Sequence, residues 1–264
     1  MGGEWTRDLA ATLWSNRARS GGDSEYFRYP MVKRIAETAK AVIVHNPAAA
    51  AVVRNHCAAA RIVEIPHLLA PVDMPHAREV EVLRRSLGSG PLFGIFGHLR
   101  ESKRVLPVLR VFSRLKDLRL LLAGEIISSD LRRAAEPYLS LPNVHHIGYM
   151  SPQMYWTAAQ AIDACINLRY PAAGETSGVS IGLMGAGTPV IMTDSLENAS
   201  YPEGTCIRIS SGIKEEAELE AIVRWAADHR PRLREIGRRA AEYIRETHAV
   251  SKVADKLIEC VGSS

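Results

Sequence analysis

Two short segments of this sequence combine small residues with charged side chains directly after strand-like runs. In the first, a strand-like run ending at Leu168 leads into a loop of small residues around one carboxylate, Glu175. A short helix is predicted directly afterwards, over 180–186, so the free N–H groups of a helix N-terminus lie at the end of a strand. Those N–H groups stabilise an anion, while Glu175 can accept hydrogen bonds from hydroxyl groups. Phosphate and polyol together indicate a nucleotide sugar.

The second segment is basic and follows another strand-like run, over 92–97. Gly97 ends that run, and a residue without a Cβ lets the backbone approach a ligand closely. Four basic side chains follow within seven positions: His98, Arg100, Lys103 and Arg104. Cations in such a loop can neutralise a departing diphosphate without a metal ion. Solvated charge at a helix start is the competing interpretation, and it is strongest for Arg100 and Arg104.

The rest of the chain supplies alternating elements that would position both segments. Strands are predicted at 92–97, 118–123, 144–147, 164–168, 189–192 and 206–209, and helices at 105–116, 131–139, 152–161, 180–186, 214–229 and 231–261. Strand–helix alternation with short connections requires a parallel sheet covered on both faces. In such a sheet the loops at the carboxyl ends of the strands form the ligand crevice. The two segments are therefore predicted to face the same crevice.

Less pattern is present in the first 90 residues. A helix over 31–40, a strand over 41–44, an alanine-rich helix over 47–60 and a strand over 62–66 are predicted there. Residues 68–90 contain two prolines, a charged segment and Gly-Ser-Gly, which is typical of a linker. The expected organisation is an α/β chain with these parts: a remnant of an N-terminal domain (1–67), a linker (68–90), a doubly wound Rossmann-like parallel sheet (91–235) and a C-terminal helix (236–264).

An apolar stripe runs through the last helices of the chain. Its members are Trp225, Ile236, Tyr243, Ile244, Val253 and Leu257. A stripe of this kind must be buried against another element. Packing on the N-terminal part and packing on the stripe's own domain are equally compatible with the sequence.

The composition excludes several classes of protein. The chain of 264 residues is 47% hydrophobic and 23% charged, as is ordinary for a soluble globular protein. Its net charge of +4 suits anionic ligands but is too small to indicate nucleic-acid binding. No run approaches the length of a membrane span and no signal-like N-terminus is present, so a cytoplasmic protein is expected. Arg17, Arg19, Lys33 and Arg34 are as compatible with peripheral contact to an anionic membrane as with a solvated surface.

Cysteine usage gives no sign of metal binding. The four cysteines are scattered through the chain without the paired spacing of metal ligands. Cys165 lies inside an apolar strand-like run and is predicted to be a buried, reduced thiol. No metal ion and no cofactor beyond a nucleotide-sugar substrate is expected.

Six segments, taken in order, resemble one known family. They are 97–103, 120–125, 144–150, 161–165, 174–178 and 187–191. Each is short, but the ordered set is similar to the nucleotide-sugar-binding half of the retaining GT-B glycosyltransferases, the GT4-like "glycosyl transferases group 1" family. Residues 40–46 also resemble the last strand of that family's N-terminal domain. The resemblance covers about two thirds of the chain and implies a GT-B fold.

The resemblance implies roles for individual residues. In the family a basic residue after the first glycine and a lysine a few positions on contact the diphosphate, and these positions hold His98 and Lys103 here. Glu175 matches the first acid of a two-glutamate motif, which contacts the donor sugar. The second, ribose-binding glutamate would fall near Gly182 or Leu183, neither of which can accept a hydrogen bond with its side chain. The other candidate donor contacts are Gly97, Arg100, Tyr149, Met150, Thr176, Ser177, Gly178 and Val179.

Two functions follow from these observations, and the sequence leaves both open. The first is retaining, metal-independent transfer of a sugar, in which Lys103 and His98 stabilise the departing nucleotide diphosphate and Glu175 orients the sugar. The second is a non-catalytic nucleotide-sugar-binding subunit, or half of a split transferase, that needs a partner chain for the acceptor site. The second arises because only 67 residues precede the linker, where the family has a whole domain.

Two other enzyme classes are disfavoured. The segment Gly94 to Gly97 is not the Gly-x-Gly-x-x-Gly of a Rossmann dehydrogenase. No nucleophile elbow of a Ser–His–Asp hydrolase occurs either. The donor base, the sugar and the acceptor are not specified by the sequence.

Overall fold

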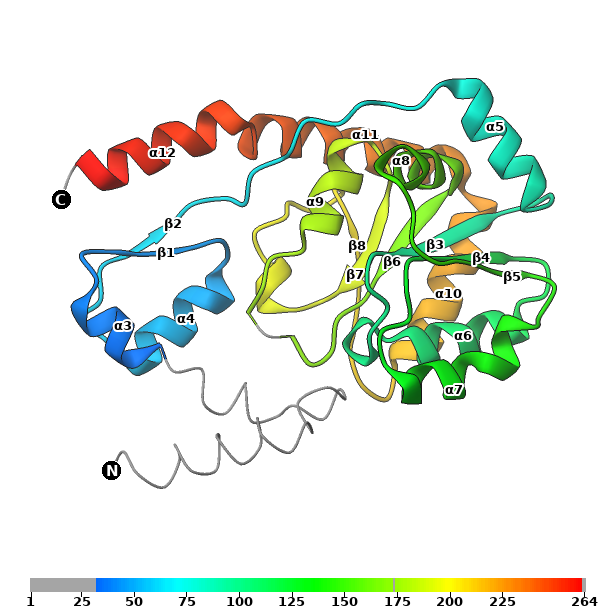
Figure 1. Cartoon of the computed structure of the whole chain (residues 1–264), viewed down its shortest axis with the longest axis horizontal. Coiled ribbons are helices and arrows are strands. Elements are labelled where there is room, and N and C mark those ends of the chain that lie inside the picture. Colours follow the sequence, from blue (N-terminus) through cyan, green and yellow to red (C-terminus); the bar gives the residue numbers. More distant parts are fainter. Residues whose placement is uncertain (1–31, 173, 263–264) are drawn as a thin grey trace.

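The computed structural model describes residues 32–172 and 174–262, which form a large α/β domain and a small N-terminal unit (Figure 1). Predictions that fall on 1–31, including the basic Arg17 and Arg19, lie outside the described residues. Within the described part of the chain, no helix has the length and apolar character needed to cross a membrane.

The large domain is built on a six-stranded parallel sheet. Its spatial order is β5-β4-β3-β6-β7-β8, and every neighbouring pair runs parallel. The strands are β3 (Leu92–Phe96), β4 (Arg119–Ala123), β5 (Val144–Ile147), β6 (Ala164–Asn167), β7 (Val190–Thr193) and β8 (Ile207–Ile209). The order reverses between β3 and β6, as in doubly wound Rossmann-type sheets. The predicted fold class is therefore confirmed.

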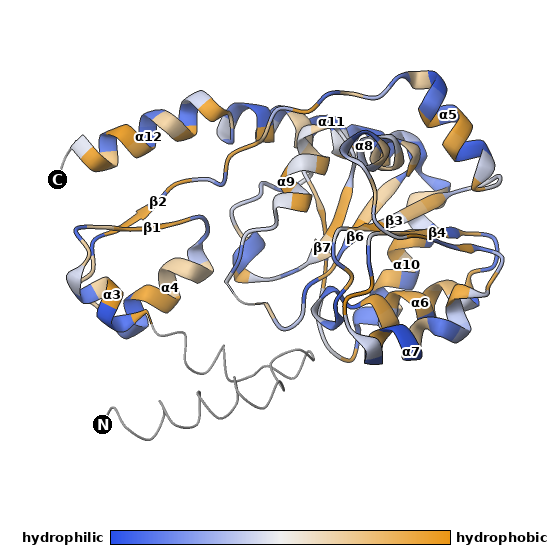
Figure 2. Ribbon diagram, viewed as in Figure 1, coloured by the Kyte–Doolittle hydropathy of each residue, from blue (hydrophilic) through white to orange (hydrophobic). Residues whose placement is uncertain are grey.

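Both faces of this sheet are covered by helices, because alternate residues of its strands point to opposite sides. On one face, Phe93 and Ile95 of β3 are fully buried against Phe112. On the other face, Leu92 and Phe96 pack with apolar residues of the second set of helices. Figure 2 shows the resulting hydrophobic strands between helices with hydrophilic outer surfaces. The first face carries α6 (Val105–Arg114), α7 (Ser129–Leu139) and α10 (Glu215–Asp228), and the second carries α5 (Ala77–Ser86), α8 (Pro152–Ala161), α9 (Gly178–Gly185) and α11 (Arg230–Thr247).

The small unit contains two parallel strands and two helices. They are α3 (Lys33–Thr38), β1 (Val42–Val44), α4 (Pro47–His56) and β2 (Ile62–Glu64). Its core is a small cluster of Ala36, Val44, Ala50 and Val53. Two strands alone form a marginal sheet, so this unit depends on additional packing.

The last helix, α12 (Val250–Gly262), supplies that packing. Val253 and Cys260 of α12 form a buried cluster with Ile65, which directly follows β2. The apolar stripe of the C-terminal helices is thus divided. Trp225 and Tyr243 pack in the large domain, whereas Val253 packs on the small unit.

Residues 68–90 include a helix as well as extended chain. The helix α5 packs beside α8, and Arg84 of α5 forms an ion pair with Asp163 at 2.7 Å. The same carboxylate accepts a hydrogen bond from the backbone N–H of Leu92 at 2.8 Å. These contacts fix α5 to the start of β3, while residues 66–76 connect the two units without regular structure.

Candidate functional site

The two chemically interesting loops meet where the strand order reverses. The loop after β3, residues 97–104, is called the basic loop, and the loop after β6, residues 168–172 and 174–177, is called the Glu175 loop. The backbone N–H of Tyr170 donates to the carbonyl of Ser102 at 2.8 Å, which joins the two loops directly. Both loops therefore lie together at the carboxyl edge of β3 and β6, where the sequence predicts the ligand crevice, and this edge is called the crevice below.

Gly97 turns the chain out of β3 with a backbone conformation that favours glycine. Its φ is +82°, and a Cβ at this position would lie 3.4 Å from Val179 of α9. The neighbouring Gly124, which follows β4, approaches so closely that a Cβ on it would be 2.1 Å from the Gly97 carbonyl oxygen. The floor of the crevice is thus backbone, and it lies directly against the beginning of α9.

Lys103 places a buried cation under this turn. Only 6% of the residue is exposed, and its Nζ donates a hydrogen bond to the Phe96 carbonyl at the end of β3. A Cβ on Gly97 would lie 3.2 Å from the same Nζ. Burial, and then the nearby charge of Arg169, lower the pKa of Lys103 from 10.5 to about 8. An anion in the crevice would favour the charged form of this lysine.

The helix α9 presents its N-terminus to the crevice. Ser177 caps it, since the Ser177 Oγ accepts the N–H of Ser180 at 3.2 Å, and Asn167 of β6 holds that hydroxyl at 2.8 Å. The helix therefore begins at Gly178, two residues before the predicted start. The N–H groups of Gly178 and Val179 have no intrahelical acceptor, because they belong to the first turn. Free N–H groups of this kind can stabilise an anion, and they lie next to Gly97.

Glu175 lies in the second loop and is paired with an arginine. Its carboxylate contacts the Nη1 of Arg169, and the two side chains are 53% and 20% exposed. The backbone N–H of Arg169 is itself fixed by the Thr193 Oγ1 at 2.9 Å. Burial, and then the charge of Arg100, lower the pKa of the Arg169 guanidinium. The crevice therefore contains a carboxylate beside several cations that repel one another.

The small unit contributes one wall of the crevice. Asn46 caps α4 through its Oδ1, and its Nδ2 donates to the Gly174 carbonyl at 2.9 Å and to the Thr176 Oγ1 at 2.8 Å. His67, just after β2, would lie 3.8 Å from a Cβ placed on Gly178. The Glu175 loop and the start of α9 thus face residues from the N-terminal part of the chain.

Other predicted site residues have different surroundings. His98 and Arg100 are exposed in the basic loop. Tyr149 is 82% exposed after β5, two strands from β3, while the neighbouring Met150 is half-buried against the core. Thr176 is half-buried and Ser177 is buried. The structure thus brings the basic loop, Glu175 and α9 together, and it places Tyr149 and Met150 at the neighbouring end of the sheet.

The positions expected for a ribose-binding acid have no access to the crevice. Leu183 is fully buried in the core of the second helical face. A Cβ on Gly182 would lie 3.1 Å from the ring of Trp156 in α8. A carboxylate at either position would be buried without a partner, which is costly. Recognition of a ribose would have to come from elsewhere.

Arg104 differs from the other basic residues of its loop because its charge is already neutralised. It takes a left-handed backbone conformation with φ +57°, and its Nε donates to Glu215 of α10 at 2.8 Å. Glu215 is 1% exposed. The guanidinium carbon also lies 5.7 Å from the centre of the Tyr170 ring, which is within cation–π range. Arg104 therefore holds the basic loop, α10 and the Glu175 loop together.

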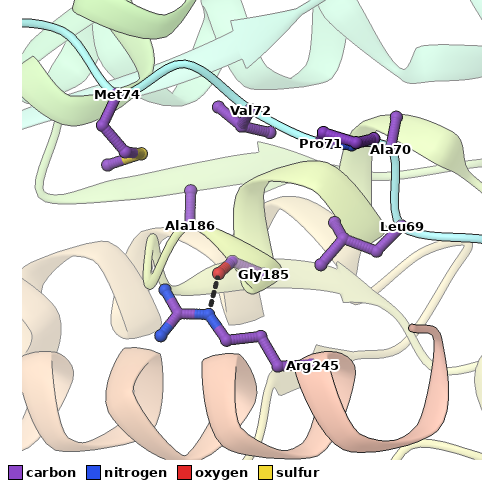
Figure 3. A pocket seen from close by; sticks show the side chains of 8 residues that line it. All are labelled: Leu69, Ala70, Pro71, Val72, Met74, Gly185, Ala186 and Arg245. Atoms are coloured by element: carbon purple, nitrogen blue, oxygen red, sulfur yellow. Dashed lines mark hydrogen bonds between the residues drawn. The ribbon is translucent and has the colours of Figure 1, made fainter. Parts of the chain in front are cut away.

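A separate groove lies at the other end of α9. Its accessible volume is about 210 Å³, and it is bounded by the extended chain before α5, the C-terminal end of α9 and one residue of α11 (Figure 3). Arg245 crosses its base and donates from Nε to the Gly185 carbonyl at 3.0 Å. The lining is mostly apolar: Leu69, Ala70, Pro71, Val72, Met74, Gly185, Ala186 and Arg245. This groove is distinct from the crevice at the N-terminal end of α9.

Cysteines and possible metal ligands give no second site. The thiol of Cys165 is buried and free, as predicted, and burial raises its pKa to about 12. Across residues 32–172 and 174–262, no cluster of three or more His, Cys, Asp or Glu side chains is arranged to hold a metal ion.

An open parallel sheet with cations, a helix N-terminus and a carboxylate at its switch point defines a Rossmann-like domain of the type found in GT-B glycosyltransferases. Residues 103–259 match the model of the family described as "Glycosyl transferase-like". This match covers more than half of the chain, and the chain belongs to that family. A comparison with the sequences of curated proteins found no match.

Solved structures share the fold at low sequence identity. The sucrose-phosphate synthase of Thermosynechococcus elongatus aligns with a TM-score of 0.77 and 18% identity, over 94% of this chain and 64% of that one. HepE of Anabaena, solved with UDP-glucose, gives a TM-score of 0.77 and 16% identity, over 92% of this chain and 68% of that one. WaaG, a glycosyltransferase involved in lipopolysaccharide biosynthesis, gives a TM-score of 0.72 and 17% identity, over 91% of this chain and 68% of that one. The present chain thus spans about two thirds of the length of these proteins.

Three residues of the crevice were not among the sequence-predicted site residues: Asn46, His67 and Arg169. Asn46-Pro47 is a helix-start signal, but nothing in it indicates contacts with residues 128 and 130 positions later. Arg169 directly follows a buried strand run at the predicted crevice edge. This position could have identified it as a candidate site residue. His67 carries no local signal, because its place depends on how the small unit packs on α9.

Proposed function

We propose that this chain binds a nucleotide sugar in the crevice and transfers the sugar with retention of configuration, without a metal ion. The observation that carries the proposal is the meeting of Lys103, the α9 N-terminus and Glu175 at the β3–β6 switch point. Lys103 and the N–H groups of Gly178 and Val179 would hold the diphosphate. His98 and Arg100, exposed in the same loop, would add positive charge at its outer side.

The chemistry assigned to these groups is stabilisation of a leaving group. The bond between the anomeric carbon and the diphosphate oxygen breaks, and the electron pair leaves with the nucleotide. The acceptor oxygen then bonds to the same face of that carbon and gives its proton to the departing diphosphate oxygen. Negative charge grows on the diphosphate as the bond breaks, and fixed donors with little access to water stabilise it strongly. Glu175 would orient the sugar through its hydroxyl groups.

Related structures support the choice of donor. HepE of Anabaena has been solved with UDP-glucose and with UDP, which are a nucleotide sugar and its product. The GT4-like assignment and a cytoplasmic location belong to the same proposal. Tyr149 and Met150 are the candidate contacts for the base, since they follow β5 at the same edge of the sheet.

A second candidate is a donor-binding subunit that acts only with a partner chain. The observation behind it is that, among the described residues, the small unit has two strands beside the six of the large domain. The acceptor site would then be completed by the partner.

The test is calorimetric titration of the purified chain with UDP, GDP and ADP and their glucose conjugates, followed by a transfer and hydrolysis assay with and without EDTA. We expect selective binding of one nucleotide, about tenfold or more weaker in Lys103→Ala. Turnover by the chain alone would exclude the subunit alternative, and loss of turnover in EDTA would contradict metal independence. Unchanged binding in Lys103→Ala would overturn the proposed site.

A further inference from the structure

Arg169 is a half-buried cation to which the proposed donor site assigns no role. It is the second residue after β6, at the point where the strand order reverses. Its backbone is fixed by Thr193, and its Nε is buried with no hydrogen-bond partner among the described residues. Its Nη1 reaches Glu175. A guanidinium has five N–H donors, so one contact with a carboxylate leaves several available.

The surroundings of Arg169 carry a surplus of positive charge. The charge of Arg100 lowers the pKa of Arg169, and the charge of Arg169 lowers the pKa of Lys103. Glu175 is half exposed, and it is the one carboxylate recorded in contact with Arg169 among the described residues. Like charges in a partly buried site repel strongly because water screens them poorly. A ligand carrying two adjacent negative charges would relieve this repulsion.

The chemistry of arginine fits such a ligand better than that of lysine. Its planar fork can contact phosphate oxygens in a bidentate way while another edge stays on a carboxylate. Lys103 instead donates to the Phe96 carbonyl from beneath the Gly97 turn. Arg169 and Lys103 therefore approach the crevice from two different loops, which the Tyr170–Ser102 hydrogen bond holds together.

We propose that Arg169 is a further donor-binding residue, whose guanidinium bridges the diphosphate of the donor and Glu175. The phosphate end and the sugar end of the donor are then recognised together. This inference rests on the proposed function, because it takes the ligand to be a nucleotide sugar. It adds a residue that couples the two ends of that ligand.

The experiment is calorimetric titration of the full chain and its variants with UDP and with UDP-glucose, or with the matching pair for whichever base the wild-type chain binds. Arg169→Gln is expected to weaken both ligands by about tenfold or more. Glu175→Gln is expected to weaken the nucleotide sugar alone. In the double variant the two losses on the nucleotide sugar should not add, since the residues act through each other. Arg114→Gln is the matched control, because Arg114 pairs with Glu216 and Glu220 on the outside of α6 and should leave both affinities unchanged.

The outcomes separate this inference from the proposed function. If Lys103→Ala loses binding while Arg169→Gln binds UDP like the wild type, Arg169 is only a support for Glu175 and the inference is wrong. If the wild-type chain binds no nucleotide, the proposed function fails and the inference fails with it. Should Arg169→Gln not fold, Arg169→Lys keeps the charge without the fork. A several-fold loss of UDP affinity in that variant supports bidentate binding, and full affinity contradicts it.

Discussion

The two units of this chain are stabilised in different ways. The large domain has six strands with helices on both faces, and its aromatic core residues Phe93, Phe96 and Phe112 are fully buried. The small unit has two strands and a cluster of alanines and valines. It completes its packing with α12, which comes from the other end of the described chain. Figure 1 shows this helix lying along β1 and β2.

This difference in packing corresponds to the part of the crevice that each unit provides. The large domain is rigid enough to keep the Lys103 ammonium almost entirely out of water, next to a backbone floor. The small unit faces the same crevice through Asn46, and the connecting segment 66–76 faces it through His67. One wall of the crevice is therefore a fixed part of a folded core, and the other depends on docking.

The largest expected effect compares the two cores directly. Phe112→Ala removes a fully buried ring and should lower the free energy of unfolding of the large domain by about 3–5 kcal/mol. Val53→Ala in the small unit should cost roughly 2 kcal/mol, at about 0.8 kcal/mol for each buried carbon removed. Urea denaturation followed by tryptophan fluorescence measures the first effect, and hydrogen exchange of α4 measures the second. If Val53→Ala lowered the free energy of the global transition seen by tryptophan fluorescence by its full roughly 2 kcal/mol, the two units would unfold as one.

The buried charge of Lys103 should appear as a dependence of stability on pH. Since its pKa is lowered from 10.5 to about 8, the unfolded chain holds more protons than the folded chain between those values. The free energy of unfolding should therefore rise as the pH increases from about 8 to 10.5. At 1.36 kcal/mol for each pKa unit, the rise approaches roughly 3 kcal/mol. Below about pH 8 the folded chain bears the full cost of burying the charged Lys103 side chain.

Lys103→Met is the matched variant for this effect, because it keeps the length of the side chain without the charge. Its stability should exceed that of the wild type at pH 7 and should lack the rise above pH 8. Urea denaturation of both proteins from pH 7 to 10 checks this. Parallel curves would mean that Lys103 titrates normally in the folded chain.

A charge on the buried face of α12 should release the small unit. Val253 is 5% exposed against Ile65, so Val253→Asp places an unpaired carboxylate in an apolar cluster, at a cost of about 2 kcal/mol or more. Limited proteolysis should then cut residues 66–76 faster, while the unfolding midpoint of the large domain stays unchanged. Ile258→Asp on the same helix is the control, because Ile258 is 70% exposed. Equal cleavage of both variants would contradict the docking role of α12.

The smallest effect concerns the contact between the two units at the crevice. Asn46→Ala should remove the cap of α4 and the hydrogen bonds to Gly174 and Thr176, at about 1–2 kcal/mol in local stability. Asn46→Ser keeps a capping oxygen but loses the amide donor. We expect both variants to bind a nucleotide sugar several-fold more weakly, with helix stability preserved only in Asn46→Ser. Calorimetry measures the affinity for the nucleotide sugar, and hydrogen exchange measures the stability of α4. If Asn46→Ser bound the nucleotide sugar with wild-type affinity, the small unit would not support the Glu175 loop.

The sequence predicted the large domain well for a physical reason. Its strands are short apolar runs buried on both sides, such as Leu92–Phe96, and they alternate with helices whose boundaries have local signals. The meeting of the basic loop and the Glu175 loop followed from parallel topology alone. The start of α9 was placed two residues late, because Ser177 acts as a cap and Gly178 enters the helix.

What the sequence could not predict depends on contacts between distant parts of the chain. The pairing of Arg169 with Glu175 depends on loop conformation, and that of Arg104 with Glu215 spans 111 positions. The sequence also could not show that the C-terminal apolar stripe packs partly on the large domain and partly on the small unit. Sequence periodicity shows which face of a helix is apolar, but it does not show what covers that face.

The chain passes between the two units twice, once through residues 66–76 and once at the junction of α11 and α12. These passages are tied together, because the Leu69 N–H donates to the His248 carbonyl at 2.7 Å and His248 Nδ1 lies 2.6 Å from the His67 carbonyl. The two passages therefore lie side by side and connect the units at one place. Asn46 adds a further link, because its side chain donates to Gly174 and Thr176 of the Glu175 loop. A movement of the small unit away from the Glu175 loop would have to break these two hydrogen bonds, so they oppose widening of the crevice.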